Sequence, residues 1–152
     1  MKIYKAGDQF EDEVEQLLIE NNIVYEREGT KVSRGHTSGK GDCDFKLKNA
    51  KVVMECKEIG LLNNLTLPGI NRKTGKPYVS TRIHTHQLRF LRERTSKGVL
   101  GYLIIKETST NGYYALTMRN LDSLLIENPK LRTLKNIDKH KIILEDFIRK
   151  LK

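Results

Sequence analysis

The segment "GDCDFKLKNAKVVMECKE", residues 41–58, constrains the fold most, because apolar residues alternate on both sides of a short turn. A two-residue turn at Asn49 and Ala50 would join its halves into an antiparallel hairpin. In that register Phe45 lies opposite Met54, and Asp44 lies opposite Glu55. Directly opposed side chains share one face of a hairpin. One face is therefore expected to be an apolar stripe of Cys43, Phe45, Leu47, Val52, Met54 and Cys56.

The other face of this hairpin carries charged residues gathered at one end, namely Asp42, Asp44, Glu55 and Lys57. Neighbouring carboxylates repel each other unless they are protonated or bridged by a cation. Mg²⁺ prefers one or two carboxylates together with water and phosphate, and a lysine beside them stabilises charge on a phosphate or orients an attacking water. A solvent-facing salt bridge among Asp42, Glu55 and Lys57 explains the same residues without a function. Both interpretations are open at this stage.

The rest of the chain alternates helical and strand patterns, which predicts a mixed α/β fold in one domain over residues 1–152. Phe10, Val14 and Leu18 recur at helical spacing and predict a helix over residues 8–21. The further predicted elements are a strand within 21–28, a basic loop over 29–41, an irregular basic segment at about 60–83, a helix over 83–98, strands at 99–107 and 112–118, and helices near 121–127 and 142–152.

The charge of the chain favours a polyanionic partner. Lysine and arginine outnumber acidic residues 28 to 19, which gives a formal net charge of +9. Such an excess is typical of proteins that bind nucleic acid. No apolar run is long enough for a membrane span and no secretion signal is visible, so we expect a cytoplasmic protein without a membrane partner. Cys43 and Cys56 lack disulfide or zinc spacing.

The order of an acid, an apolar strand and Glu-x-Lys in "GDCDFKL…VVMECKE" resembles the PD-(D/E)XK nuclease superfamily, although the proline of that name is absent. "AGDQFEDEVEQLL" is similar to the Gly-x-x-x-Glu helix of cellular and archaeal Holliday junction resolvases and aligns Glu11, with Glu13 as the alternative. "LTLPGI", "THQLRFL" and "SKGVLGYLII" resemble segments of RecU-type resolvases in the same order. The resemblance spans about residues 6–107.

The resemblance implies a restriction-endonuclease-like fold, a mixed central β-sheet flanked by helices, and a Mg²⁺-dependent endonuclease in which Mn²⁺ substitutes. Asp44 and Glu55 would hold the metal, with the Cys56 carbonyl as a further ligand. Asp42 has the commoner family spacing, but Asp44 is preferred because Phe45 follows it and Glu55 opposes it. Lys57 would assist the attacking water, and Glu11 would bind a second metal or its water shell. Gln87 would contact metal-bound water or DNA, or is an ordinary polar residue on a helix surface.

DNA binding is expected from basic and polar residues on either side of this site, and the archaeal Ser-Gly pattern adds Ser38. The set is Lys31, Arg34, Ser38, Lys40, Arg72, Lys73, Lys76, Arg82, His86 and Arg89. The predicted function is cleavage of four-way DNA junctions in recombination and repair by a homodimer. The alternatives are a restriction-like, repair or transposition nuclease of the same fold, and a non-catalytic DNA-binding module.

Overall fold

The computed structural model describes residues 6–27, 31–33, 36–38, 43–47, 51–68, 83–128, 131–134 and 137–152. The helices within these residues are α1 (Ala6–Glu20), α2 (Thr85–Ser96), α3 (Met118–Glu127) and α4 (Leu144–Lys150), with short 3₁₀ turns at Leu62–Asn64 and Asp138–His140. The strands are β1 (Tyr25–Arg27), β2 (Lys31–Ser33), β3 (His36–Ser38), β4 (Phe45–Leu47), β5 (Val52–Ile59), β6 (Leu100–Glu107), β7 (Gly112–Thr117) and β8 (Lys141–Ile142).

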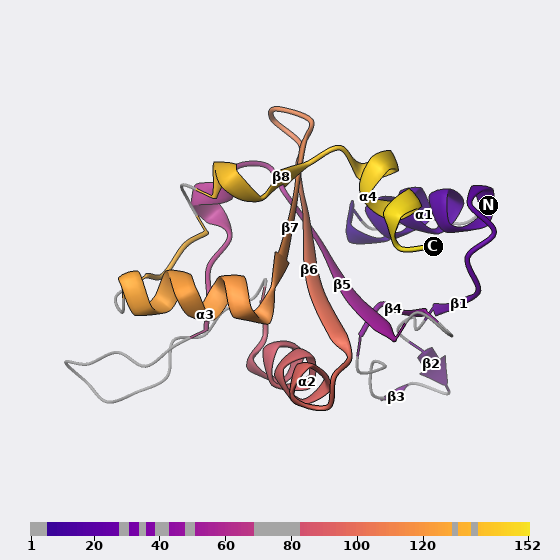
Figure 1. Cartoon of the computed structure of the whole chain (residues 1–152), viewed down its shortest axis with the longest axis horizontal. Coiled ribbons are helices and arrows are strands. Elements are labelled where there is room, and N and C mark those ends of the chain that lie inside the picture. The colour runs from indigo at the N-terminus through magenta and orange to yellow at the C-terminus, as the bar shows by residue number, and fades with distance from the viewer. Residues whose placement is uncertain are drawn as a thin grey trace.

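A six-stranded mixed sheet in the order β1-β4-β5-β6-β7-β8 forms the centre of the fold. The long neighbours β5 and β6 run parallel, and the other pairs are antiparallel. Helix α2 makes the crossover between the two parallel strands, as a parallel connection requires. Helices α1 and α4 pack on one face of the sheet, and α2 and α3 pack on the other (Figure 1). The predicted α/β class, with a mixed central sheet flanked by helices, is confirmed.

Both faces of the central strand β5 are buried, which follows from the helices that cover each side. Val52, Met54 and Cys56 pack with Phe10 and Val14 of α1. The alternate residues of β5 face α2, where Val53 and Ile59 join the second core cluster. The face of the hairpin that carries the charged residues is therefore covered by a helix rather than open to solvent.

The predicted hairpin register is confirmed where β4 and β5 pair. Phe45 lies opposite Met54 and Leu47 opposite Val52. The prediction for Cys43 is wrong: its side chain lies in the core cluster under α2. Strand β4 begins only at Phe45, and a bend at residues 43–44 turns Cys43 away from the apolar stripe.

Three predicted boundaries change in the structure. Part of the expected loop at 29–41 forms strands β2 and β3, which pair with each other. The start of the irregular segment at 60–83 is packed, since Leu65 and Leu67 are buried, while residues 69–82 lie outside the described part. The last helix begins at Leu144 rather than at residue 142, because Ile142 pairs with Tyr113 as part of β8.

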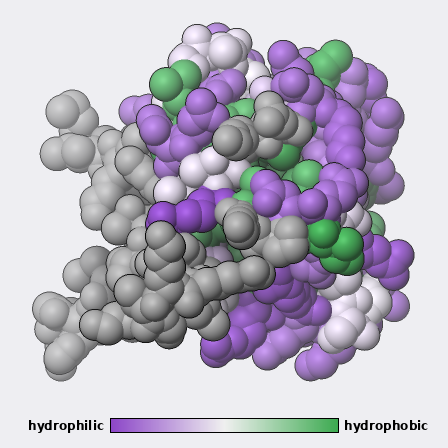
Figure 2. Space-filling view, turned by 90° about the vertical axis from the view of Figure 1, so that its left-hand side faces the viewer, coloured by the Kyte–Doolittle hydropathy of each residue, from purple (hydrophilic) through white to green (hydrophobic). Residues whose placement is uncertain are grey.

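The surface seen in Figure 2 is mainly hydrophilic where the described residues form it, and apolar side chains occur there in small separate groups. Exposed large apolar residues such as Ile126 on α3 are spread over several elements. Scattered apolar residues of this kind are normal for a surface in contact with water. None of the described helices has the length and apolarity that crossing a membrane requires.

Candidate functional site

Asp44 and Glu55 lie at the start of β4, where that strand runs beside β5. The backbone N–H of Asp44 donates to the carbonyl of Met54 at 3.1 Å, and the Asp44 carboxylate Oδ2 accepts from the N–H of Cys56 at 2.7 Å. The side chain of Asp44 thus continues the ladder before the first residue of β4, Phe45. Only 1% of Asp44 and 1% of Glu55 is exposed to solvent. The fold therefore buries both carboxylates, and that of Asp44 is bound to the residue that follows Glu55 in β5.

Helix α2 and Lys57 both contact the Glu55 carboxylate. The Gln87 amide donates to Glu55 Oε1 at 2.7 Å, and the Lys57 ammonium lies 3.5 Å from the same oxygen. The other end of the Gln87 amide accepts from the backbone N–H of His84 at 2.9 Å, which caps the start of α2. Gln87 is buried, so the expectation of an ordinary surface residue is wrong.

The burial of these charges argues against the solvent-facing salt bridge. Moving an ionised carboxylate out of water costs roughly several kcal/mol for each ion, unless partners in the protein replace the lost hydration. An apolar residue at position 55 would join Val53 and Ile59 in the same core cluster at no such cost. The side chain of Lys57 is 14% exposed, so it too is largely withdrawn from water. Asp42, the remaining member of the supposed bridge, lies outside the described residues.

The pKa of the Cys56 thiol depends on the charged groups around it. Burial raises the pKa of the Cys56 thiol well above its usual value, and the charges of Asp44, Glu55 and Glu11 raise it further, whereas Lys57 lowers it. Four of the predicted site residues therefore act on one thiol, which stays protonated at neutral pH. The N–H of Cys56 points to Asp44, and its carbonyl points to the same strand edge, because both groups of one strand residue do.

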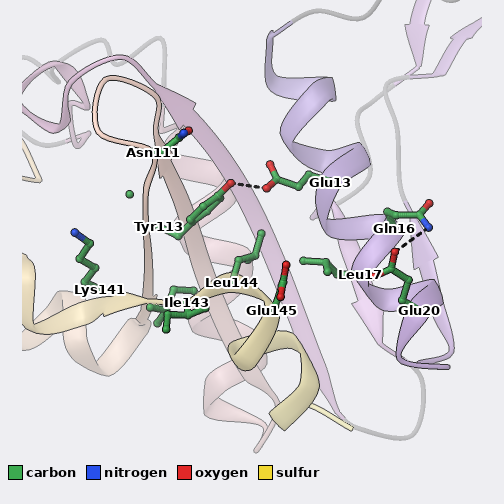
Figure 3. Close-up of a pocket in the computed structure, with 12 residues that line it drawn as sticks. Glu13, Gln16, Leu17, Glu20, Asn111, Tyr113, Lys141, Ile143, Leu144 and Glu145 are labelled. Atoms are coloured by element: carbon green, nitrogen blue, oxygen red, sulfur yellow. Dashed lines mark hydrogen bonds between the residues drawn. The ribbon is translucent and has the colours of Figure 1, made fainter.

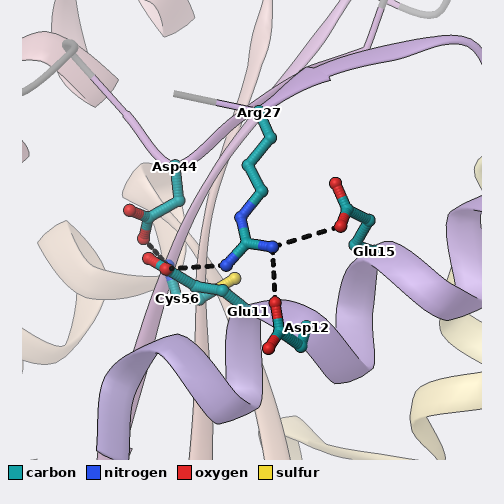
Figure 4. A network of polar contacts seen from close by, with 6 residues as sticks. All are labelled: Glu11, Asp12, Glu15, Arg27, Asp44 and Cys56. Carbon is teal, nitrogen blue, oxygen red and sulfur yellow. Dashed lines mark hydrogen bonds and ion pairs between the residues drawn. The ribbon is translucent and has the colours of Figure 1, made fainter. Parts of the chain in front are cut away.

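Glu11 and Glu13 lie on different sides of α1. Glu11 contacts Arg27 of β1, in a group that also contains Asp44 and Cys56 (Figure 4). Glu13 instead pairs with Lys106 of β6 at 2.9 Å and accepts a short hydrogen bond from the Tyr113 hydroxyl. The structure thus brings Glu11 toward the predicted site and leaves Glu13 away from it.

The donor set fits a hard divalent cation better than zinc. Within the described part of the chain, no cluster of three or more His, Cys, Asp or Glu side chains is positioned to hold a metal by itself. Asp44 and Glu55 supply carboxylate oxygens, and the Cys56 carbonyl faces the same edge. Mg²⁺ needs only one or two carboxylates and completes its shell with water and substrate phosphate, whereas structural zinc needs four protein ligands.

No protein-family model matches this chain, and a search of curated proteins finds no match either. The functional interpretation therefore depends on the geometry of the site and on the motifs of the sequence.

The expected DNA-binding residues are described only in part. His86 and Arg89 are exposed on α2, and the ring of His86 stacks on that of His84 with centroids 5.5 Å apart. Lys31 and Ser38 face each other across β2 and β3, but their side chains are not among those described. The others lie outside the described residues: Arg34, Lys40, Arg72, Lys73, Lys76 and Arg82.

Two features near the site escaped the sequence prediction. Arg27 of β1 binds three carboxylates of α1. A basic residue in a strand that follows an acidic helix is the sequence feature that could have indicated this contact. Two cations approach the ring of Phe90 on α2, the Lys46 ammonium at 5.9 Å and the Arg94 guanidinium at 5.0 Å from its centre. This pairing needs β4 and α2 side by side, so no local pattern shows it.

A separate cavity of about 680 Å³ lies between α1 and the β7–β8–α4 edge (Figure 3). Glu13, Tyr113 and Ile143 line it, and the residues of the predicted site do not. The predicted site is thus not in this cavity.

Gln87 gives the first test of the site's architecture. We expect Gln87→Ala to lower the free energy of unfolding by about 2–3 kcal/mol, because it removes a helix cap and leaves a buried carboxylate short of a donor. Asn120→Ala is the matched control: Asn120 caps α3 through Thr117 in the same way, without a buried carboxylate partner. That change should cost about 1 kcal/mol. Urea unfolding measures both, and equal losses would show that Gln87 acts only as a cap.

Proposed function

We propose that this chain is a divalent-metal-dependent DNA endonuclease of the PD-(D/E)XK type, with a restriction-endonuclease-like fold, and that it cleaves four-way junctions as a homodimer. The observation that carries the proposal is a pair of buried carboxylates around one stretch of β5, since Asp44 accepts from the N–H of Cys56 and Glu55 pairs with Lys57. A protein that only bound DNA would not need acidic groups there, because carboxylates repel phosphates.

The chemistry proposed for each residue is the one that the family resemblance implies, and the contacts of these residues are compatible with it. Asp44 and Glu55 would hold Mg²⁺, which when bound would lower the pKa of a water and offset charge on the phosphate. Gln87 holds Glu55 Oε1 from α2, so this carboxylate is oriented before any ligand arrives. The Lys57 ammonium, 3.5 Å from Glu55, lies where it would orient the attacking water and stabilise the charge that develops on the phosphate oxygens. Hydrolysis in line would leave a 5′-phosphate and a 3′-hydroxyl.

Binding is supported by charge and by one mixed patch beside the site. Lys46 lies two residues beyond Asp44 on the same face of β4, and Lys46, Phe90 and Arg94 form a basic-aromatic group there. Cations of this kind neutralise DNA phosphates, and an aromatic ring among them offers a surface for an unpaired base. The net charge of the chain, +9, is positive like this group and also favours binding to DNA phosphates. We therefore expect the DNA backbone to pass over β4 and along α2.

The junction and the dimer follow from the family resemblance and from symmetry. A four-way junction resolved by paired cuts needs two active sites related by a two-fold axis. The described residues of one chain form one site of this kind, so we expect paired cuts to need two chains.

Cleavage assays on defined DNA test the proposal. A four-way junction labelled on each strand in turn is compared with duplex, flap and single-stranded DNA, in Mg²⁺, Mn²⁺ or EDTA. We expect paired symmetric nicks on the junction in either metal and none in EDTA. Cutting of duplex at a fixed sequence would replace the resolvase by a restriction-type enzyme. Tight binding without cleavage of any substrate would show a DNA-binding module.

A further inference from the structure

Arg27 lies at the end of β1, between helix α1 and the strand that leads to Asp44. It pairs in the sheet with Phe45, and its guanidinium stands 5.9 Å from the centre of that ring. From there it reaches three carboxylates of α1 (Figure 4). The positive charge of Arg27 thus lies next to the proposed site. Arg27 is not part of the sequence motif and has no role in the proposed chemistry.

The three contacts of Arg27 are unequal and use different nitrogens. Nη1 lies 2.6 Å from Asp12 and 3.1 Å from Glu15, whereas Nη2 lies 3.4 Å from Glu11. Burial lowers the pKa of the Arg27 guanidinium, but the hydrogen bond and charge of Asp12 and the charges of Glu15 and Glu11 outweigh it and raise the pKa overall. Asp12 and Glu15 would therefore keep the guanidinium in place if Glu11 were to move away.

Glu11 is also the carboxylate of this group that lies deepest. Its side chain is 14% exposed, against 34% for Asp12 and 28% for Glu15. Its charge acts on the thiol of Cys56 together with those of Asp44 and Glu55. Glu11 thus contacts Arg27 and also lies near Cys56, whose N–H is bound to Asp44 (Figure 4).

We propose that Arg27 is an internal counter-ion for Glu11, and that Glu11 exchanges this cation for a divalent metal ion when the site is loaded. The inference rests on the proposed function. Glu11 has the longest of the three contacts, so it is the one most easily released, and the two contacts through Nη1 keep Arg27 beside α1 afterwards. Arg27 is then a positioning residue that competes with the metal and lowers its affinity.

Titration of the full chain with Mn²⁺ alone, without DNA, tests the exchange by calorimetry. We expect Arg27→Gln to bind Mn²⁺ about tenfold more tightly, the effect of removing one unit charge several ångströms away in a partly exposed place. Asp12→Asn should act in the opposite direction and weaken Mn²⁺ binding about threefold, because Arg27 then loses one carboxylate partner and interacts more strongly with Glu11. Arg149→Gln is the control: it removes the same charge from an exposed pair with Asp146 and should change nothing.

The double variant separates the exchange from a general change of charge. In a Glu11→Gln background, Arg27→Gln should no longer tighten Mn²⁺ binding, since the group it competes for is gone. Circular dichroism shows whether each variant is folded, and Arg27→Lys, which keeps the charge, should bind Mn²⁺ like the unaltered chain. Equal Mn²⁺ affinities of Arg27→Gln and Arg149→Gln would overturn the proposed role of Arg27 and would leave the proposed function standing. An unaltered chain that binds no Mn²⁺ would overturn the proposed function with it.

Discussion

Single-turnover cleavage of a four-way junction should fall about 10²–10³-fold when Lys57 is replaced by methionine, the loss expected for one positioned charge at a reacting phosphate. Methionine keeps most of the aliphatic stem, so the packing of the side chain is largely retained. The ammonium group is lost, and with it the contact 3.5 Å from Glu55. Junction binding in EDTA should persist, because other basic residues remain and the altered step is chemical.

Lys106→Met is the matched control for this change. Lys106 lies on the neighbouring strand β6, is partly exposed like Lys57, and forms an ion pair of its own with Glu13. Because that pair lies outside the proposed site, its loss should leave the cleavage rate within about threefold. Similar losses in both variants would mean that removing a partly buried lysine damages the fold. Full activity of Lys57→Met would remove Lys57 from the mechanism.

Asp44→Asn should abolish metal-dependent cleavage to a similar degree, about 10³-fold, while the protein stays folded. Asparagine keeps a side-chain oxygen that can accept from the Cys56 N–H, so we expect the free energy of unfolding to change by no more than about 1 kcal/mol. Asp44→Ala removes that acceptor and should cost about 2–3 kcal/mol, because a buried N–H is left without a partner. Cleavage assays and urea unfolding together separate the two roles of the carboxylate.

Asp42→Asn is the comparison that decides which aspartate holds the metal. Asp42 is two residues away and has the commoner family spacing to Glu55. We expect this variant to cleave junctions at the unaltered rate and to bind Mn²⁺ normally. Loss of cleavage in Asp42→Asn with activity retained in Asp44→Asn would transfer the metal to Asp42 and leave Asp44 as a structural link between β4 and β5.

The hairpin and its register were predictable because a strand repeats every second residue. Phe45, Leu47, Val52 and Met54 can share a face only in the observed register, and a shift by one would expose all of them. Helix α2 was predictable from its own sequence, and the family resemblance pointed to Gln87. The hydrogen bond from Gln87 to Glu55 was not predictable, because it depends on how the helix crosses over the sheet.

The remaining differences arise where a tertiary contact overrides a local pattern. Cys43 alternates correctly with Phe45 in the sequence, but the bend at residues 43–44 places it in the opposite core. Ile142 belongs to the apolar pattern of the last helix, yet it pairs with Tyr113 at the edge of the sheet. The ion-pair partners of Arg27 in the described part of the chain are distant in sequence. Its ligands lie 12 to 16 residues earlier in the chain, on the helix that packs beside it.

The parallel pairing of β5 with β6 has a consequence for the order of folding. All of β5, from Val52 to Ile59, is bonded to a strand that begins only at Leu100. Closing a loop of that length costs conformational entropy before any of the contacts forms, and such non-local pairing slows folding. On a ribosome the β4–β5 hairpin emerges first, with its acidic residues still hydrated. The chain can bury them only after α2 and β6 have been synthesised, so the site is completed late, when most of the domain has left the exit tunnel.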